Sequence, residues 1–175
     1  FYRSRGHRGW QSAHLHTSHN LGNDAALRAN IATEQGTAYN ASEIDRSVVS
    51  LALDKQFGTS LLWQSSVIYE DSKNTAEPFQ FYLDAYDDAG SGGRMPKVTY
   101  DYDDINVDNA YYKTETLLAS TGIEWQINEQ WILDYQIGFS RKDHQSNKAF
   151  VDLLNAEGDY SGAIYNFAGR LDTLF

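Results

Sequence analysis

The chain of 175 residues contains no cysteine, two prolines and one methionine, and it has no apolar run of eighteen residues. Without cysteine, disulfide scaffolds, thiolate metal sites and cysteine nucleophiles are excluded. Without a long apolar run, a transmembrane helix is excluded. Basic residues are also scarce, 14 against 24 acidic ones, and the net charge is −10. A general nucleic-acid-binding role therefore does not fit, because phosphate binding needs a basic surface.

What the chain does have is aromatic residues, at 14%, and a strong alternation of apolar and polar residues. Alternation with a period of two is typical of strands with one apolar and one polar face. We therefore predict an all-β fold of about seven strands, with an eighth possible near residues 162–171. The clearest alternating segments are Gln11–Ser18, Ala25–Glu34, Val49–Asp54, Leu61–Glu70, Leu117–Ile127 and Trp131–Ser140.

The links between these segments alternate between short and long. The short polar ones are residues 20–24, 57–59 and 128–130, and the long ones are residues 36–45, 71–114 and 142–147. In an up-and-down antiparallel sheet, this order places all tight turns at one end and all long loops at the other. Outer-membrane barrels have that asymmetry, together with strands of about ten residues and aromatic girdles.

A soluble β-sandwich is the alternative, because its strands also alternate. Sandwich strands are usually shorter, about 5–6 residues, than several of the segments here. The polar positions also carry Ser, Gly, Gln and Asn rather than the Lys and Glu of a solvated surface. Both features favour an antiparallel transmembrane β-barrel.

Five stretches resemble the barrel of TonB-dependent siderophore receptors: Arg46–Asn74, Tyr112–Leu118, Glu124–Leu133, Ser140-Arg141 and Gly92–Pro96. Their order and spacing fit early barrel strands over about residues 11–175. That family uses 22 strands and a plug domain, which need several hundred residues. The resemblance therefore implies that residues 1–175 are a partial barrel domain of seven to eight strands without a plug. Residues 71–114 would then be a long outward loop and Phe175 a truncation point.

The resemblance implies an outer-membrane receptor that takes up a ferric siderophore, or a similar scarce nutrient, in a Gram-negative bacterium. TonB would act through a plug absent from this chain, and the strands would contact membrane lipid and lipopolysaccharide. It implies no enzyme activity and no cofactor, because iron enters only as the chelated ligand. The alternative is a small self-contained outer-membrane barrel that acts as an adhesin or structural protein.

Aromatic residues interleave with acidic ones in the long loop, and they are the candidate ligand-binding groups. Exposed tyrosines give a large, rigid contact area, and Arg94 could bind an anionic chelate. The alternative is that these rings form a girdle or pack the loop on itself. The candidates are Tyr82, Tyr86, Arg94, Tyr100, Tyr102, Tyr111 and Tyr112.

Two metal sites and an enzyme site are weaker hypotheses. His14 and His16 share a strand face and have His19 nearby, but a polar barrel lumen also accounts for them. Asp101-x-Asp103 begins like a calcium loop but lacks the glycine and the final glutamate. We expect no metal site, and no set of residues has the spacing of a catalytic triad.

Overall fold

The computed structural model describes residues 2–5, 9–81, 98–154 and 157–175. It contains one sheet and, at the loop end, the short helix α2 (Tyr102–Ile105). The strands are β1 (Tyr2–Arg5), β2 (Gln11–Gly22), β3 (Ala25–Thr37), β4 (Glu43–Phe57), β5 (Leu61–Thr75), β6 (Gln80–Phe81), β7 (Tyr111–Gln126), β8 (Ile132–Leu154) and β9 (Tyr160–Leu174).

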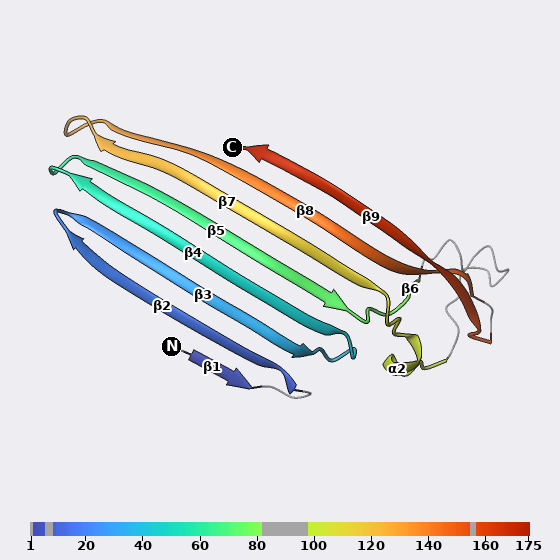
Figure 1. Cartoon of the computed structure of the whole chain (residues 1–175). Helices are drawn as coiled ribbons and strands as arrows, with labels where there is room; N and C mark the ends of the chain where they lie inside the picture. The colour runs from blue at the N-terminus through green and yellow to red at the C-terminus, as the bar shows by residue number, and fades with distance from the viewer. Residues whose placement is uncertain (1, 6–8, 82–97, 155–156) are drawn as a thin grey trace.

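The long strands follow one another in antiparallel order, as the alternation predicts (Figure 1). β6 is the exception, a two-residue strand that pairs in parallel with β8 beyond the start of β7. β1 pairs with β2 and β9 with β8, and within the described residues the sheet does not close on itself. The predicted all-β antiparallel class is confirmed, and β9 is the eighth antiparallel strand expected in the tail.

The predicted tight turns are present, and the sequence explains their conformation. Asn23 and Asp24 link β2 to β3 with φ angles of 50° and 59°. Asn and Asp tolerate this left-handed region, which a two-residue hairpin turn requires. In the turn between β7 and β8, the Asn128 side-chain oxygen accepts hydrogen bonds from the backbone N–H groups of Gln130 and Trp131. All of these turns lie at the same end of the sheet (Figure 1).

One predicted link is wrong. Residues 142–147 do not form a loop, because β8 continues through them to Leu154 and pairs with both β7 and β9. The sequence from Arg141 to Asn147 is polar on both faces of the strand. Hydropathy therefore stops alternating there, while the backbone stays extended.

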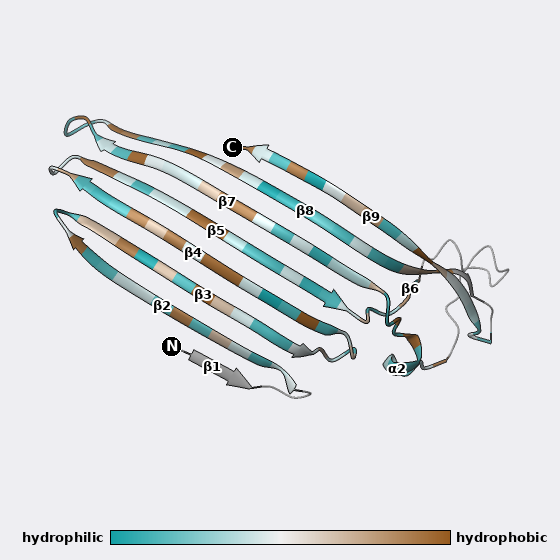
Figure 2. Ribbon diagram, viewed as in Figure 1, coloured by the Kyte–Doolittle hydropathy of each residue, from teal (hydrophilic) through white to brown (hydrophobic). Residues whose placement is uncertain are grey.

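The two faces of the sheet differ in chemistry. One face, the apolar face, carries rows of directly paired apolar side chains, such as Leu51, Val67, Ala119, Phe139 and Leu174 across five strands. The other, the polar face, carries small and amide side chains, and there Asn30 donates a hydrogen bond to Ser50. Hydropathy alternates along β3, β4 and β5 (Figure 2).

No layer of the described chain covers the apolar face, and many of its large side chains are exposed. The side chains that are buried and apolar gather at the loop end instead, as Ile105, Ala110, Ala149, Phe150 and Val151. A soluble domain would place a second layer on such a face. The sheet is therefore built for apolar surroundings on one side.

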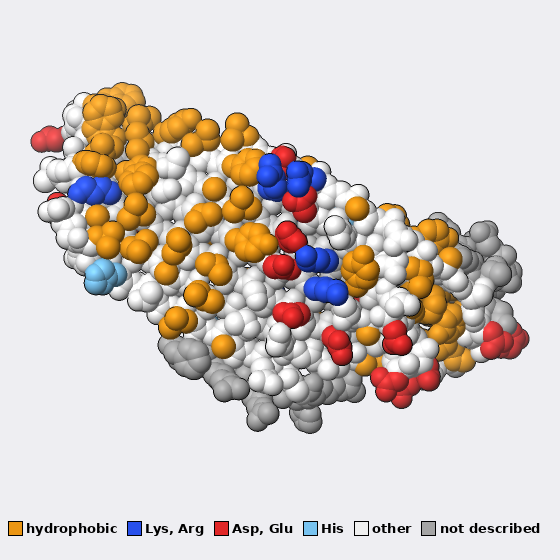
Figure 3. Space-filling model, in the orientation of Figure 1, with side chains coloured by type: hydrophobic (Ala, Val, Ile, Leu, Met, Phe, Trp, Pro, Cys, Tyr) orange, Lys and Arg blue, Asp and Glu red, His pale blue; other side chains and the backbone are white. Residues whose placement is uncertain are grey.

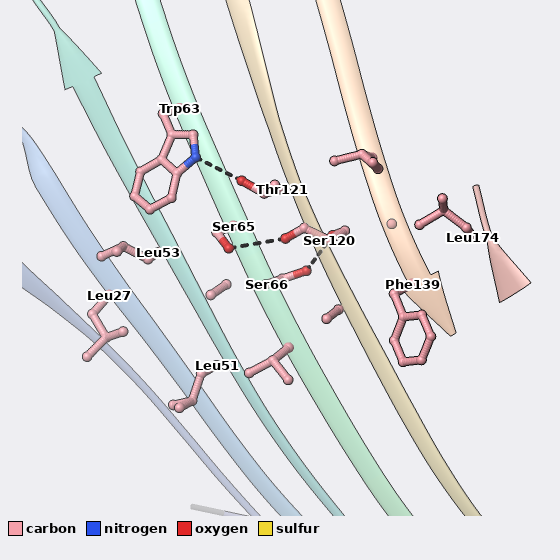
Figure 4. A pocket seen from close by; sticks show the side chains of 15 residues that line it. Leu27, Leu51, Leu53, Trp63, Ser65, Ser66, Ser120, Thr121, Phe139 and Leu174 are labelled. Atoms are coloured by element: carbon pink, nitrogen blue, oxygen red, sulfur yellow. Dashed lines mark hydrogen bonds between the residues drawn. The ribbon is translucent and has the colours of Figure 1, made fainter. Parts of the chain in front are cut away.

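The hydroxyl groups near the centre of the apolar face are satisfied within the sheet. They line a shallow depression of about 620 Å³ (Figure 4). Trp63 Nε1 donates to Thr121 Oγ1 at 2.8 Å, and Thr121 donates to the Gln64 carbonyl at 3.2 Å. Ser65 Oγ donates to the Ser120 carbonyl at 3.1 Å. The side-chain donors of Trp63, Ser65 and Thr121 are thus all hydrogen-bonded within the sheet, as a surface in contact with lipid requires.

Among the described residues, no helix has the length and apolar character needed to cross a membrane.

A lysine on the apolar face should destabilise the protein in a bilayer. Ile137→Lys places a charge within the apolar rows and should cost about 2–4 kcal/mol, depending on its depth. Gln136→Lys, the matched control, places the same charge one residue away on the polar face and should cost about 0.5 kcal/mol or less. Urea unfolding of the full-length protein in lipid vesicles, followed by tryptophan fluorescence, measures both. Equal losses would show that the apolar face does not contact lipid.

Candidate functional site

A belt of ion pairs borders the apolar rows on the apolar face. Arg141 Nε lies 2.8 Å from Asp172, and Arg170 Nε lies 2.6 Å from Asp143. Lys113 Nζ lies 2.6 Å from Glu115. Figure 3 shows hydrophobic side chains gathered toward the tight turns and charged ones gathered across the middle of this face.

The belt starts at the edge of the apolar rows, where Arg141 pairs with Leu117, and Asp143 pairs with Glu115 two residues further on. Charged groups avoid the hydrocarbon region, so the belt marks where apolar surroundings end. β8 runs on from Arg141 to Leu154. The loop end of the sheet therefore projects beyond this boundary.

A hollow of about 370 Å³ lies at this projecting end. The turn between β3 and β4 forms one side and the segment that follows β5 forms the other. Ile44 and Asn74 pair across β4 and β5 and line the hollow from the polar face. Its lining residues are Ala38, Tyr39, Asn40, Ser42, Ile44, Asn74, Glu77, Pro78, Phe79 and Gln80.

Local hydrogen bonds fix the turn between β3 and β4. The side-chain oxygen of Asn40 accepts a hydrogen bond of 2.7 Å from the Ser42 hydroxyl. The Ala38 backbone N–H donates to the Ser42 carbonyl at 2.7 Å. Ala41 has a φ of 60°, a conformation that non-glycine residues rarely adopt. The turn therefore holds Tyr39 in one place, where its side chain is 79% exposed.

Helix α2 is attached to the rim of the hollow. The Tyr102 ring meets Tyr39 edge to face, with centroids 6.0 Å apart. Asn106 Nδ2 donates to the Asn40 carbonyl at 3.0 Å, and the Phe79 N–H donates to the Ile105 carbonyl at 3.0 Å. Two exposed tyrosine rings thus stand side by side at the opening, from segments that are far apart in the sequence.

An ion pair connects the segment after β5 to β8. Lys148 Nζ binds the Glu77 carboxylate, and the two side chains are only 17% and 15% exposed. Lys148 also lies 4.7 Å above the centroid of the Tyr112 ring, which stacks on His144 with centroids 6.3 Å apart. These contacts hold one wall of the hollow against the polar face.

The predicted ligand-binding residues do not come together as one group. Tyr82, Tyr86 and Arg94 lie outside the described residues. Tyr102 lies at the rim of the hollow. Tyr112 lies beside the hollow, because Lys148, which binds the lining residue Glu77, stands over its ring.

Two other candidates are placed away from the hollow. Tyr111 is on the face opposite to Tyr112, near Lys73. Tyr100 packs with Phe81 and Tyr160, and its hydroxyl donates to the Gly158 carbonyl at 2.6 Å. The contacts of Tyr100 are those of a ring that packs the loop on itself, which is the alternative stated above. A ligand role for the predicted residues stays a prediction.

Sequence reasoning missed Tyr39, which is the most exposed aromatic ring at the hollow. It lies in the link 36–45, which was predicted only as a connection. The signal that could have found it is a lone large aromatic side chain within a polar turn.

The histidines do not converge on a metal site. His14 and His16 share the polar face as predicted, while His19 pairs with Leu27 on the apolar face. Asp101 lies at the start of α2. Among the described residues, no group of three or more side chains could hold a metal ion.

The fold resembles that of solved receptors. One is the Ferric-Catecholate import receptor Fiu from K12 E. coli, with a TM-score of 0.72 and 15% identity over 97% of this chain. Another is the siderophore receptor PiuA from Acinetobacter baumannii, with a TM-score of 0.67 and 14% identity over 98% of this chain. This chain covers 26% of each of those chains. No family model and no curated protein matches the sequence.

At this identity the likeness concerns the fold. It confirms the resemblance to siderophore receptors stated above and the predicted barrel-type sheet. Both solved proteins are receptors rather than enzymes.

Breaking the Glu77–Lys148 pair should loosen the wall of the hollow. Glu77→Gln leaves a mostly buried cation without its carboxylate, which should cost about 1–3 kcal/mol of local stability. Hydrogen exchange measures this at the backbone N–H of Val107, which donates to the Glu77 carbonyl at 3.1 Å. The control is Arg141→Gln, which removes an exposed pair and should leave exchange at Val107 unchanged. Unchanged exchange at Val107 in Glu77→Gln would show that the pair does not hold this segment.

Proposed function

We propose that this chain is part of the barrel of a TonB-dependent outer-membrane receptor that takes up a ferric siderophore or a similar scarce nutrient. The observation that carries the proposal is the fold likeness to two siderophore receptors over nearly all of this chain. The apolar face, its belt of ion pairs and the projecting loop end support it, because they suit a sheet that crosses an outer membrane.

In this proposal the chain binds its ligand and carries out no chemistry. The loop end captures the chelate, and the hollow at the rim contacts part of it. Iron arrives inside the ligand, so the protein needs no cofactor. The apolar face contacts the lipid of a Gram-negative outer membrane, and the belt contacts lipopolysaccharide. A plug domain in another part of the receptor couples to TonB, and nucleic acid has no role.

The alternative is a small self-contained barrel that serves as an adhesin or structural protein. Such a barrel would need its first and last strands to pair. In the described part of the chain, β1 and β9 form opposite edges of the sheet (Figure 1). The open sheet therefore favours the receptor proposal, in which further strands complete the barrel.

Cellular uptake tests the proposed function. In the native host, deletion of the gene should abolish uptake of one ferric siderophore labelled with radioactive iron, and loss of TonB should have the same effect. Immunoblots of the outer-membrane fraction should show a band several-fold heavier than 19.8 kDa, and iron starvation should induce it. A heat-modifiable band near 19.8 kDa, with uptake unchanged after deletion, would contradict the proposal and support the small barrel.

Removal of the Tyr39 ring should weaken ligand binding. Tyr39→Ala deletes an exposed aromatic surface at the hollow and should raise the Kd by about tenfold, or about 1.4 kcal/mol. Tyr39→Phe keeps the ring and should stay within about threefold of the parent. Fluorescence titration of the full-length receptor with the transported chelate measures both. If Tyr39→Ala binds as well as the parent, the ligand does not contact the hollow.

A further inference from the structure

We infer that the hollow selects ferric chelates without excess negative charge, of the trihydroxamate type, over polyanionic triscatecholates. The inference rests on the proposed function and names the class of ligand for the same site. It is carried by the chemistry of the lining side chains, with the charge of the surrounding segment in support.

The polar groups that line the hollow are almost all neutral. Asn40, Asn74 and Gln80 contribute amide groups, and Ser42 contributes a hydroxyl that donates to the Asn40 side chain. Of the lining residues that the structure describes, only Glu77 is charged. Because Lys148 binds that carboxylate, the pair adds no net charge. Such a surface can hydrogen-bond to carbonyl oxygens and amide groups, but it cannot neutralise an anion.

The described cations near the hollow are engaged in ion pairs or lie on the apolar face. Lys73 lies on the apolar face, 5.7 Å from the centroid of the Tyr111 ring. Lys113 is also on the apolar face, in its ion pair with Glu115. Lys148 is bound to Glu77 and lies over Tyr112. Among the described residues that line the hollow, none is a cation that could bind a polyanion.

The segment that forms the rim is strongly acidic. Its described residues, 76–81 and 98–110, contain five acidic residues and no basic one. Three of the acids, Asp101, Asp103 and Asp104, are exposed on or next to α2, beside Tyr102. At physiological ionic strength the screening length for their charges is about 8 Å. This distance covers the approach to a hollow at the same rim. An anionic ligand is repelled there, and a neutral or cationic one is not.

Chelate chemistry connects these features to a ligand class. Each hydroxamate carries one negative charge, so three of them neutralise Fe³⁺. Each catecholate carries two, so three of them leave a chelate with three excess negative charges. The trihydroxamate also presents amide and methylene groups, which suit the amide lining and the rings of Tyr39 and Tyr102.

Binding by the full-length receptor tests the inference. A neutral ferric trihydroxamate and a ferric triscatecholate are titrated separately, with tryptophan fluorescence as the readout. We expect the trihydroxamate to bind at least tenfold more tightly. Raising the salt concentration should strengthen triscatecholate binding and leave trihydroxamate binding unchanged, because salt screens only the repulsion.

A charge-removal variant isolates the rim. The triple variant Asp101→Asn, Asp103→Asn, Asp104→Asn should improve triscatecholate binding at least threefold and leave trihydroxamate binding unchanged. The control triple variant, Glu124→Gln, Glu129→Gln, Asp134→Asn, changes the net charge equally at the tight-turn end. It should alter neither affinity.

The outcomes separate this inference from the proposed function. Tighter triscatecholate binding by the parent, unaffected by the rim variant, would overturn the inference and leave siderophore uptake intact. If neither chelate binds and gene deletion changes no iron uptake, the proposed function itself fails. An equal effect of both triple variants would also overturn the inference, because overall charge rather than the rim would then set the preference.

Discussion

The rest of this structure depends on rows of apolar side chains that cross one face of the sheet without a covering layer. The antiparallel register sets Leu51, Val67, Ala119 and Phe139 directly beside one another. Once the register is fixed, every second side chain of each strand belongs to the same face. Burial of such a face is favourable only against an apolar medium. A bilayer is such a medium, and the internal hydrogen bonds of Ser65 and Thr121 suit it.

The position of the apolar rows also decides which part of the sheet can bind a ligand. The ion pairs of the belt end the apolar rows, and the strands continue past them toward the loop end. Beyond the belt, the sheet no longer needs one apolar face, so it can carry polar side chains on both. The hollow, the tyrosine rim and the acidic residues of α2 all lie in this outer part. In the proposed function, this boundary separates the part of the chain that stays in the membrane from the part that binds the ligand.

The loop end is held by a few specific contacts rather than by a large core. Lys148 binds Glu77, and Asn106 donates to the Asn40 carbonyl. A small cluster around Val151 adds packing from Phe79, Phe81 and Tyr160. Such an arrangement keeps the hollow formed and leaves the rings of Tyr39 and Tyr102 exposed.

The sequence by itself determined the antiparallel all-β class, the two faces and the tight turns, because alternation and turn residues are local properties. It could not show that β8 passes through residues 142–147, since a strand that is polar on both faces has no alternation to detect. Only the tertiary structure brought Tyr39 beside Tyr102 and placed Tyr111 and Tyr112 on opposite faces. Contacts between distant segments depend on register and loop path, and neither is written in the composition of a single segment.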